Sequence, residues 1–210
     1  MRFADLDAVT VDGYGTLLHL EDPVPPLVNA LAAHGVEREA EAVRNAFARE
    51  VAHYKPRAHT GHDPESLAAL RTECVAVFLG ALGSNVPPQL FVDDFIGSLV
   101  FSPAPGATET LELLRGQELK LAVVANWDCA LPGHLEAAGL NGYFDTVVTS
   151  ARAGVAKPDP AIFRLALDEL GVSPGRTMHV GDEPIDEEGA RAAGLAFAPA
   201  PLASAFEGWA

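Results

Sequence analysis

The sequence predicts an α/β fold: a Rossmann-like parallel sheet with helices on both faces, together with an inserted α-helical cap. Two observations lead to this prediction. Five short apolar runs, typical of strands buried on both faces, alternate with stretches of helical periodicity. After the first run comes a long segment whose patterns are all helical. Strands that alternate with helices form a parallel sheet, and such sheets bind ligands at the carboxyl ends of their strands.

The apolar runs place the strands of the core. They cover residues 7–12, 119–126, 144–150, 176–182 and 194–199. Helices are expected between them, at residues 108–116, 129–139, 160–171 and 187–194. These stretches end at glycine, which is common at helix C-termini. The core domain is therefore predicted to comprise residues 1–19 and 101–210.

The inserted segment is predicted to be a separate helical cap domain, residues 20–100. Its helical patterns lie at residues 25–35, 39–54, 63–83 and 88–100, and no strand is expected there. The proline-rich stretches EDPVPP and SPAPGA mark its two boundaries, because proline interrupts regular elements.

The composition is that of a folded protein with a strong negative charge. Hydrophobic residues make up 49% of the 210 residues, and the formal net charge is −15. This charge argues against a nucleic-acid partner, because contacts to phosphates need a basic face. No apolar stretch is long enough to span a membrane, and Asp5 and Asp7 interrupt any signal-peptide core. Two cysteines, Cys74 and Cys129, favour a reduced, cytoplasmic setting.

Polar residues follow the first and second predicted strands. Asp12 ends the first strand, and a turn containing Gly13 leads from it to Thr16. The N–H groups of such a turn can bind an anion beside the carboxylate. Asn126 ends the second strand, where an amide can orient a ligand. Taken singly, Asp12 is also explained as a turn residue and Asn126 as a cap.

Charged residues follow two of the remaining strands. Lys157 stands just before a helix whose N-cap is expected at Asp159 and whose first residue is Pro160. Asp182 and Asp186 follow the fourth strand. A solvated lysine and acids that favour a helix N-terminus would explain these residues individually. Their ordered placement at strand ends instead favours a single site.

This ordered set resembles the haloacid dehalogenase superfamily of hydrolases. The first motif of that family, Asp-x-Asp-x-Thr, is met by DGYGT, the lysine motif by KPDP and the acidic motif by GDEPID. The resemblance runs along nearly the whole core. It is strongest to the branch that carries a helical cap between the first and second motifs.

The resemblance implies a covalent mechanism. Asp12 would be the nucleophile and form an aspartyl intermediate that water then hydrolyses. Lys157 would hold Asp12 ionised and neutralise the charge of the substrate. The expected substrate is a small phosphorylated metabolite, and the transferring group would be positioned by Gly13, Thr16 and Asn126.

The resemblance also implies a Mg²⁺ cofactor. Its ligands would be the carboxylates of Asp12, Asp182 and Asp186, with the main-chain carbonyl of Tyr14. Mg²⁺ prefers oxygen ligands, usually one or two carboxylates together with waters and substrate phosphate. The retained acids therefore favour phosphate chemistry. Substrate identity and oligomeric state do not follow from these motifs.

Two positions depart from the phosphatase pattern. Family phosphatases carry Asp as general acid and base where this chain has Tyr14, and Ser or Thr where it has Ala125. DGYGT is closer to the metal-independent 2-haloacid dehalogenases, whose halide leaving group needs no proton. Those enzymes typically have serines where this chain has Gly-Asp. A dehalogenase and a catalytically impaired phosphate-binding protein therefore remain alternatives to a phosphatase.

The cap contains one concentration of cationic side chains, at residues 49–62. If it faces the site, it would attract an anionic substrate, and a histidine could supply the missing proton. A solvated loop at a helix end is the alternative. Lys55 also resembles the Schiff-base lysine of phosphonoacetaldehyde hydrolases, although the sequence around it does not match. The cationic residues are Arg49, His53, Lys55, Arg57, His59 and His62.

Overall fold

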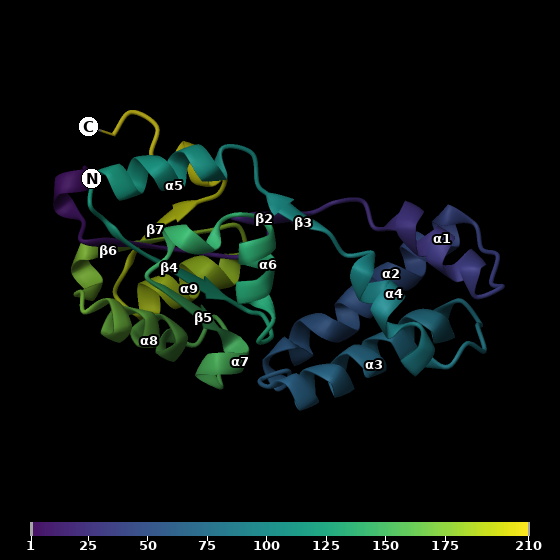
Figure 1. Cartoon of the computed structure of the whole chain (residues 1–210). Coiled ribbons are helices and arrows are strands. Elements are labelled where there is room, and N and C mark those ends of the chain that lie inside the picture. The colour runs from purple at the N-terminus through teal and green to yellow at the C-terminus, as the bar shows by residue number, and fades with distance from the viewer. Residues whose placement is uncertain (1, 210) are drawn as a thin grey trace. The chain divides into compact units, whose positions relative to one another are not determined.

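The computed structural model describes residues 2–209 and divides into two compact units (Figure 1). One unit comprises residues 1–19 and 101–210, and the other comprises residues 20–100. We refer to them below as the core and the cap.

The core is built on a five-stranded parallel sheet with the strand order β5-β4-β1-β6-β7. Its strands are β1 (Ala8–Val11), β4 (Lys120–Ala125), β5 (Thr146–Thr149), β6 (Thr177–Gly181) and β7 (Ala196–Pro199). In chain order these strands are arranged 3-2-1-4-5, which is the Rossmann arrangement. Each strand lies within its predicted range, so the predicted fold is confirmed. Because β1 is central, the residue that follows it lies in the middle of the carboxyl edge of the sheet.

Helices cover both faces of the sheet, as the labels in Figure 1 show. Because side chains alternate along a strand, Val9 and Leu121 join a hydrophobic cluster on one face, whereas Ala8 and Ala122 join a cluster on the other. The first cluster includes side chains from α5 (Ala107–Gly116), α6 (Leu131–Ala137) and α10 (Leu202–Ala205). The second includes side chains from α8 (Pro160–Leu170) and α9 (Pro184–Ala192). The short helical segments of the core are α7 (Ser150–Ala153), η1 (Phe3–Asp5), η4 (Asn141–Tyr143) and η5 (Pro174–Arg176).

A two-stranded sheet marks the points where the chain leaves and re-enters the core. It consists of β2 (Leu18–Leu20) and β3 (Phe101–Pro103). The sequence did not indicate these strands, because three residues are too few to show a period of two. Because β2 includes Leu20, the expectation that residues 20–100 contain no strand is wrong by this one residue. Helix α9 also starts earlier than predicted, since Pro184 suits a first helical turn.

The cap consists of helices packed around an aromatic centre. Its elements are α1 (Val24–Ala33), α2 (Ala40–Tyr54), η2 (Lys55–Thr60), α3 (Pro64–Ala81), η3 (Pro88–Leu90) and α4 (Val92–Gly97). The ring of Phe78 lies 6.1 Å from that of Phe91 and 5.0 Å from that of Phe95, measured between centroids. Helix α3 is capped by Asp63, whose carboxylate accepts a 2.8 Å hydrogen bond from the Ser66 N–H.

One carboxyl group is buried inside the cap. Glu50 of α2 has 6% of its surface exposed and lies beside Cys74 of α3, which is also buried. Burial raises the pKa of Glu50 to about 7, although a hydrogen bond with Cys74 opposes this rise. Burial and the nearby Glu50 carboxyl likewise raise the pKa of the Cys74 thiol. Both groups are therefore held mainly in their neutral forms below pH 7.

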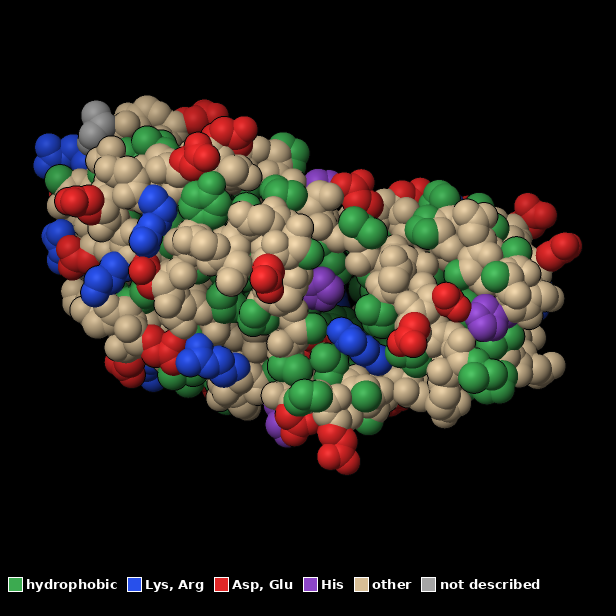
Figure 2. Space-filling view, viewed as in Figure 1, with side chains coloured by type: hydrophobic (Ala, Val, Ile, Leu, Met, Phe, Trp, Pro, Cys, Tyr) green, Lys and Arg blue, Asp and Glu red, His purple; other side chains and the backbone are tan. Residues whose placement is uncertain are grey.

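The cationic segment of the cap, residues 49–62, forms the end of α2, η2 and the turn that follows. Several of its side chains have acidic partners within the cap. The imidazole Nε2 of His53 lies 2.8 Å from Oε1 of Glu73, and Arg57 Nε lies 3.8 Å from the same oxygen. His62 Nε2 lies 3.4 Å from an Asp63 carboxylate oxygen. On the face in Figure 2, basic side chains lie scattered among acidic ones.

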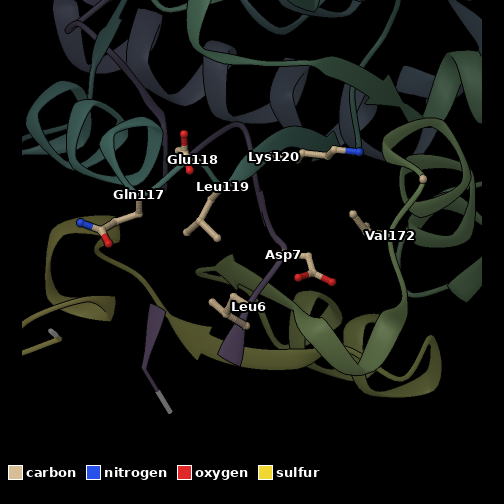
Figure 3. A pocket seen from close by; sticks show the side chains of 8 residues that line it. Leu6, Asp7, Gln117, Glu118, Leu119, Lys120 and Val172 are labelled. Carbon is tan, nitrogen blue, oxygen red and sulfur yellow. The ribbon is translucent and has the colours of Figure 1, made fainter. Parts of the chain in front are cut away.

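Two further features bear on the prediction of a site. Among the described helices, none is long and apolar enough to cross a membrane. A cavity of about 330 Å³ lies at the amino ends of β1 and β4 (Figure 3). Asp7 and Lys120 line this cavity, and both precede or begin their strands. It therefore lies at the opposite end of the strands from Asp12 and is separate from the predicted site.

Candidate active site

Asp12 and Lys157 form a buried ion pair at the carboxyl edge of the sheet. Asp12 directly follows β1, and its N–H donates a 2.9 Å hydrogen bond to the carbonyl of Val180 in β6. Its carboxylate accepts a hydrogen bond from Lys157 Nζ. Asp12 is 7% exposed and Lys157 is 5% exposed. The central strand thus aims one carboxylate at a lysine that water reaches poorly.

Asn126 holds the main chain of Lys157. Its Oδ1 accepts a 2.7 Å hydrogen bond from the Lys157 N–H, and its Nδ2 donates a 3.1 Å bond to the Lys157 carbonyl. Asp159 then caps α8 by accepting a hydrogen bond from the Ala161 N–H, and the predicted cap is confirmed. Both ends of the Asn126 amide thus fix the lysine loop. A contact between this amide and a substrate stays a prediction.

Asp186 binds the other side of the Lys157 ammonium. Its Oδ1 lies 2.5 Å from Lys157 Nζ, and its Oδ2 accepts a 3.0 Å hydrogen bond from the Glu183 N–H. Asp186 is only 1% exposed. The approach of its carboxylate depends on Gly181, because a Cβ atom there would lie 2.4 Å from Asp186 Cγ.

Asp182 completes a group of three acids. One carboxylate oxygen each from Asp12, Asp182 and Asp186 lies within 4.8 Å of the others, and Asp182 is the exposed member. Gly15 lets the first turn approach it: its φ is +87°, and a Cβ there would lie 2.4 Å from Asp182 Oδ2. Three carboxylates against one ammonium leave two negative charges. Oxygen donors with this excess charge fit a divalent cation such as Mg²⁺.

The pKa values of Asp12, Asp182 and Lys157 reflect burial first and the neighbouring charges second. Burial, together with the charge of Asp186, raises the pKa of Asp12 against the lowering effect of Lys157. Burial and the neighbouring acids also raise the pKa of Asp182. For Lys157, burial favours the neutral amine, but Asp12 and Asp186 prevail and raise its pKa. Lys157 is therefore a firm cation at neutral pH.

The other residues of the first motif surround Asp12. The Gly13 carbonyl accepts hydrogen bonds from the N–H groups of Leu17 and Leu18, at 3.0 and 2.8 Å, so this part of the turn is rigidly bonded. Thr16 is 1% exposed, and its hydroxyl has no hydrogen-bond partner among the described residues. A buried hydroxyl without a partner is costly, and a ligand oxygen would satisfy it.

The two residues that depart from the phosphatase pattern, Tyr14 and Ala125, differ in their exposure. Tyr14 is 48% exposed. Ala125, at the end of β4, is 1% exposed and belongs to the apolar cluster of one sheet face. Neither side chain carries a carboxyl group that could exchange a proton with a leaving group near neutral pH.

The sequence motifs did not indicate His179 and Thr10, which extend the cluster into the sheet. Both side chains are fully buried. His179 Nε2 lies 3.3 Å from Asp186 Oδ1, and His179 Nδ1 lies 2.9 Å from Thr10 Oγ1. Burial lowers the pKa of His179 and keeps its ring neutral. The available signal was one polar residue inside the apolar run TMHVG, since a buried polar side chain requires a partner.

Fold and site together define a class of hydrolases that have a Rossmann-like sheet and place a carboxylate directly after its first strand. The family model for haloacid dehalogenase-like hydrolases matches residues 6–194, and the chain therefore belongs to that family. The haloacid dehalogenase-like hydrolase domain-containing protein 3 of Bos taurus is 36% identical over 204 residues, which cover 90% of this chain and 80% of that protein.

Solved structures of two kinds are similar to this chain. A phosphatase of the same family from Thermococcus onnurineus is 26% identical with a TM-score of 0.61, and the match covers 91% of this chain and 85% of that one. The L-2-haloacid dehalogenase of Xanthobacter autotrophicus is also 26% identical, with a TM-score of 0.69 and coverage of 96% and 82%. The chain is thus a hydrolase of this family, and similarity alone does not choose between the two reactions.

Proposed function

We propose that this hydrolase is a Mg²⁺-dependent phosphatase that acts on a small phosphorylated metabolite through an aspartyl-phosphate intermediate. The observation that carries the proposal is the group of three acids beside a single lysine. Without a cation, three carboxylates within 4.8 Å of one another repel each other and any phosphate dianion. Asp186 also holds Lys157, but a site built only to release halide from a monoanionic substrate has no use for the exposed Asp182.

Asp12 is the proposed nucleophile. One of its carboxylate oxygens attacks phosphorus, the new oxygen–phosphorus bond forms, and the bond from phosphorus to the leaving oxygen breaks. Water then hydrolyses the acyl phosphate, which releases inorganic phosphate and restores the carboxylate. The Lys157 ammonium contacts the Asp12 carboxylate directly and favours its ionised form, which burial opposes. Thr16 offers its unpartnered hydroxyl to an oxygen of the transferring group.

The carboxylates of Asp12 and Asp182 and the main-chain carbonyl of Tyr14 would hold Mg²⁺. Asp186 would lie next to these ligands, as a further ligand or as a partner of one of them. When bound, Mg²⁺ would neutralise negative charge between the nucleophile and a phosphate dianion. Asp186 already accepts hydrogen bonds on both of its carboxylate oxygens. Its part in the site is therefore to hold Lys157 and support the cation from a short distance.

The leaving group of the proposed substrate must depart without strong acid assistance. Positioned proton transfer usually contributes about 10²- to 10⁴-fold to rate, and Tyr14 lacks the carboxyl group that would supply it. We therefore propose substrates with good leaving groups, such as acyl or enol phosphates. With a good leaving group, the site can also work without the hydrogen bond to phosphate that a Ser or Thr side chain would donate in place of Ala125.

Phosphate release from 4-nitrophenyl phosphate, with Mg²⁺ and with EDTA, tests this proposal. An activated aryl leaving group makes the acid dispensable, so we expect turnover that requires Mg²⁺. Asp12→Asn should abolish turnover without loss of the fold, and Asp168→Asn, at an exposed position on α8, is the matched control. Turnover that persists in EDTA or in a verified Asp12→Asn preparation would refute the proposed mechanism.

A metal-independent 2-haloacid dehalogenase is the second candidate. It is favoured by Tyr14, since halide leaves without a proton, and by the similarity to the Xanthobacter enzyme. The same Asp12 would then attack carbon and displace halide. Halide release from 2-chloropropionate in EDTA, together with no phosphate release in Mg²⁺, would select this reaction. A chain that binds phosphate and turns over neither substrate would be the impaired binding protein.

A further inference from the structure

We propose that His179 is a positioning residue, which Thr10 orients and which in turn fixes the Asp186 carboxylate against Lys157. The kinetic part of this inference rests on the proposed phosphatase function. The structural part concerns which atom of the imidazole carries the proton and can be measured without turnover.

Packing locks the ring of His179 in place. The side chain is fully buried in the middle of β6. The ring of Phe163 meets it edge-on, with centroids 4.9 Å apart and an interplanar angle of 85°. The Phe197 ring lies 6.4 Å away on a neighbouring strand. The imidazole therefore has little freedom to turn, and its two nitrogens face fixed partners.

The partners determine the tautomer. Asp186 Oδ1 already accepts a hydrogen bond from the Lys157 ammonium, so this oxygen is an acceptor and His179 Nε2 carries the hydrogen that points at it. In a neutral ring Nδ1 is then an acceptor, and the Thr10 hydroxyl donates to it over 2.9 Å. From Thr10 through His179 to Asp186, each donor thus has one acceptor and the hydrogen bonds run in one direction.

These bonds form a path from Thr10, which lies on β1, to Asp12, which directly follows β1. Thr10 and Asp12 lie two residues apart, so their side chains point to the same face of the sheet. From Thr10 the path runs through His179, Asp186 and Lys157 and ends at Asp12. Asp186 Oδ1 accepts from both the imidazole and the ammonium, while the Glu183 N–H holds Oδ2. Without His179, the carboxylate loses one of three fixed partners and Lys157 loses a fixed anchor.

The first experiment compares His179→Phe, His179→Gln and Thr10→Val on 4-nitrophenyl phosphate. Loss of an outer partner of a catalytic cluster typically costs about 10- to 100-fold, and we expect His179→Phe to lower kcat by this factor. His179→Gln keeps an N–H donor and should recover part of the loss. Thr10→Val keeps the side-chain shape, and we expect a smaller loss that is not additive with His179→Phe.

A merely structural role would give a different pattern. Activity would then follow melting temperature across the variants, and glutamine would perform no better than phenylalanine. Wild-type kcat in a folded His179→Phe protein would overturn the inference while the proposed function stands. If instead the wild type releases no phosphate, the proposed function fails, and the tautomer measurement decides the inference.

That measurement is the ¹⁵N NMR spectrum of histidine-labelled protein near pH 7. The signals of His179 are assigned as those missing from His179→Gln. We expect a ring protonated on Nε2, and a shifted Nδ1 signal in Thr10→Val, where Nδ1 loses its hydrogen-bond donor. A ring protonated on Nδ1, or an unchanged Nδ1 signal in Thr10→Val, would overturn the inference.

Discussion

Glu50 makes the stability of this protein depend on pH in a direction opposite to that of most acids. The pKa of this buried carboxyl is about 7 in the folded chain, against an ordinary value of 4.5. Below pH 4.5 the group is protonated in both states. As pH rises toward 7, the unfolded chain gives up this proton first, so the free energy of unfolding falls. Above pH 7 both states are ionised and the dependence ends.

The magnitude follows from the two pKa values. One pKa unit corresponds to 1.36 kcal/mol, so the whole window is worth about 3 kcal/mol. The sequence pI is about 4.7, where the protein carries little net charge, and measurements are better started at pH 5.5. Between pH 5.5 and 8.5 the same two values leave about 2 kcal/mol.

Glu50→Gln removes the titration and keeps the shape of the protonated acid. We expect its free energy of unfolding to exceed that of the wild type by about 2 kcal/mol more at pH 8.5 than at pH 5.5. Urea unfolding followed by far-UV circular dichroism measures this, because the cap is helical. Glu41→Gln is the control, since the Glu41 side chain lies on the same helix and is 79% exposed. An equal difference at both pH values, or the same widening in Glu41→Gln, would refute the reasoning.

Three further predictions concern the site. Tyr14→Asp restores a carboxyl group and should raise kcat on alkyl phosphates by about 10²- to 10⁴-fold, with a smaller gain on 4-nitrophenyl phosphate; equal gains on both would argue against proton transfer. Asp182→Asn should abolish the rise in melting temperature that Mg²⁺ produces in the wild type, and a retained rise would place the ion elsewhere. Gly15→Ala places a Cβ 2.4 Å from Asp182 Oδ2 at a positive φ, so the free energy of unfolding should fall by about 1 kcal/mol or more. The rise in melting temperature on adding Mg²⁺ should also be smaller than in the wild type. Wild-type values of both would show that the turn adjusts to the added methyl group without cost.

The sheet could be predicted from sequence because its strands are buried on both faces. The run KLAVVA is apolar on both sides of the strand, and this signal survives without any knowledge of neighbours. The short strands β2 and β3 lack such a signal. They exist because the two crossings of the chain between core and cap pair with each other, which is a long-range contact.

The candidate site was foreseeable only in part. Asp12 and Asp182 directly follow strands, Lys157 precedes α8 and Asp186 lies in the first turn of α9, and the parallel arrangement brings these positions to one edge. Asn126 shows the limit of this reasoning: its position was foreseen, but whether its amide faces a ligand or the Lys157 main chain depends on the path of a distant loop. His179 lies inside a strand, where position alone suggests a core residue.

The central place of β1 has a consequence for the order in which the protein is made. Val9 pairs with Leu121 on one side and with Met178 on the other, so the first strand must wait for most of the chain before it has two neighbours. Asp12 is synthesised well before Asp182 and Asp186, with the whole cap between them. The cap is continuous in sequence and has its own hydrophobic cluster, so it can fold while the core is incomplete. The nascent chain therefore carries Asp12, the proposed nucleophile, without its neighbouring acids until β6 has been made.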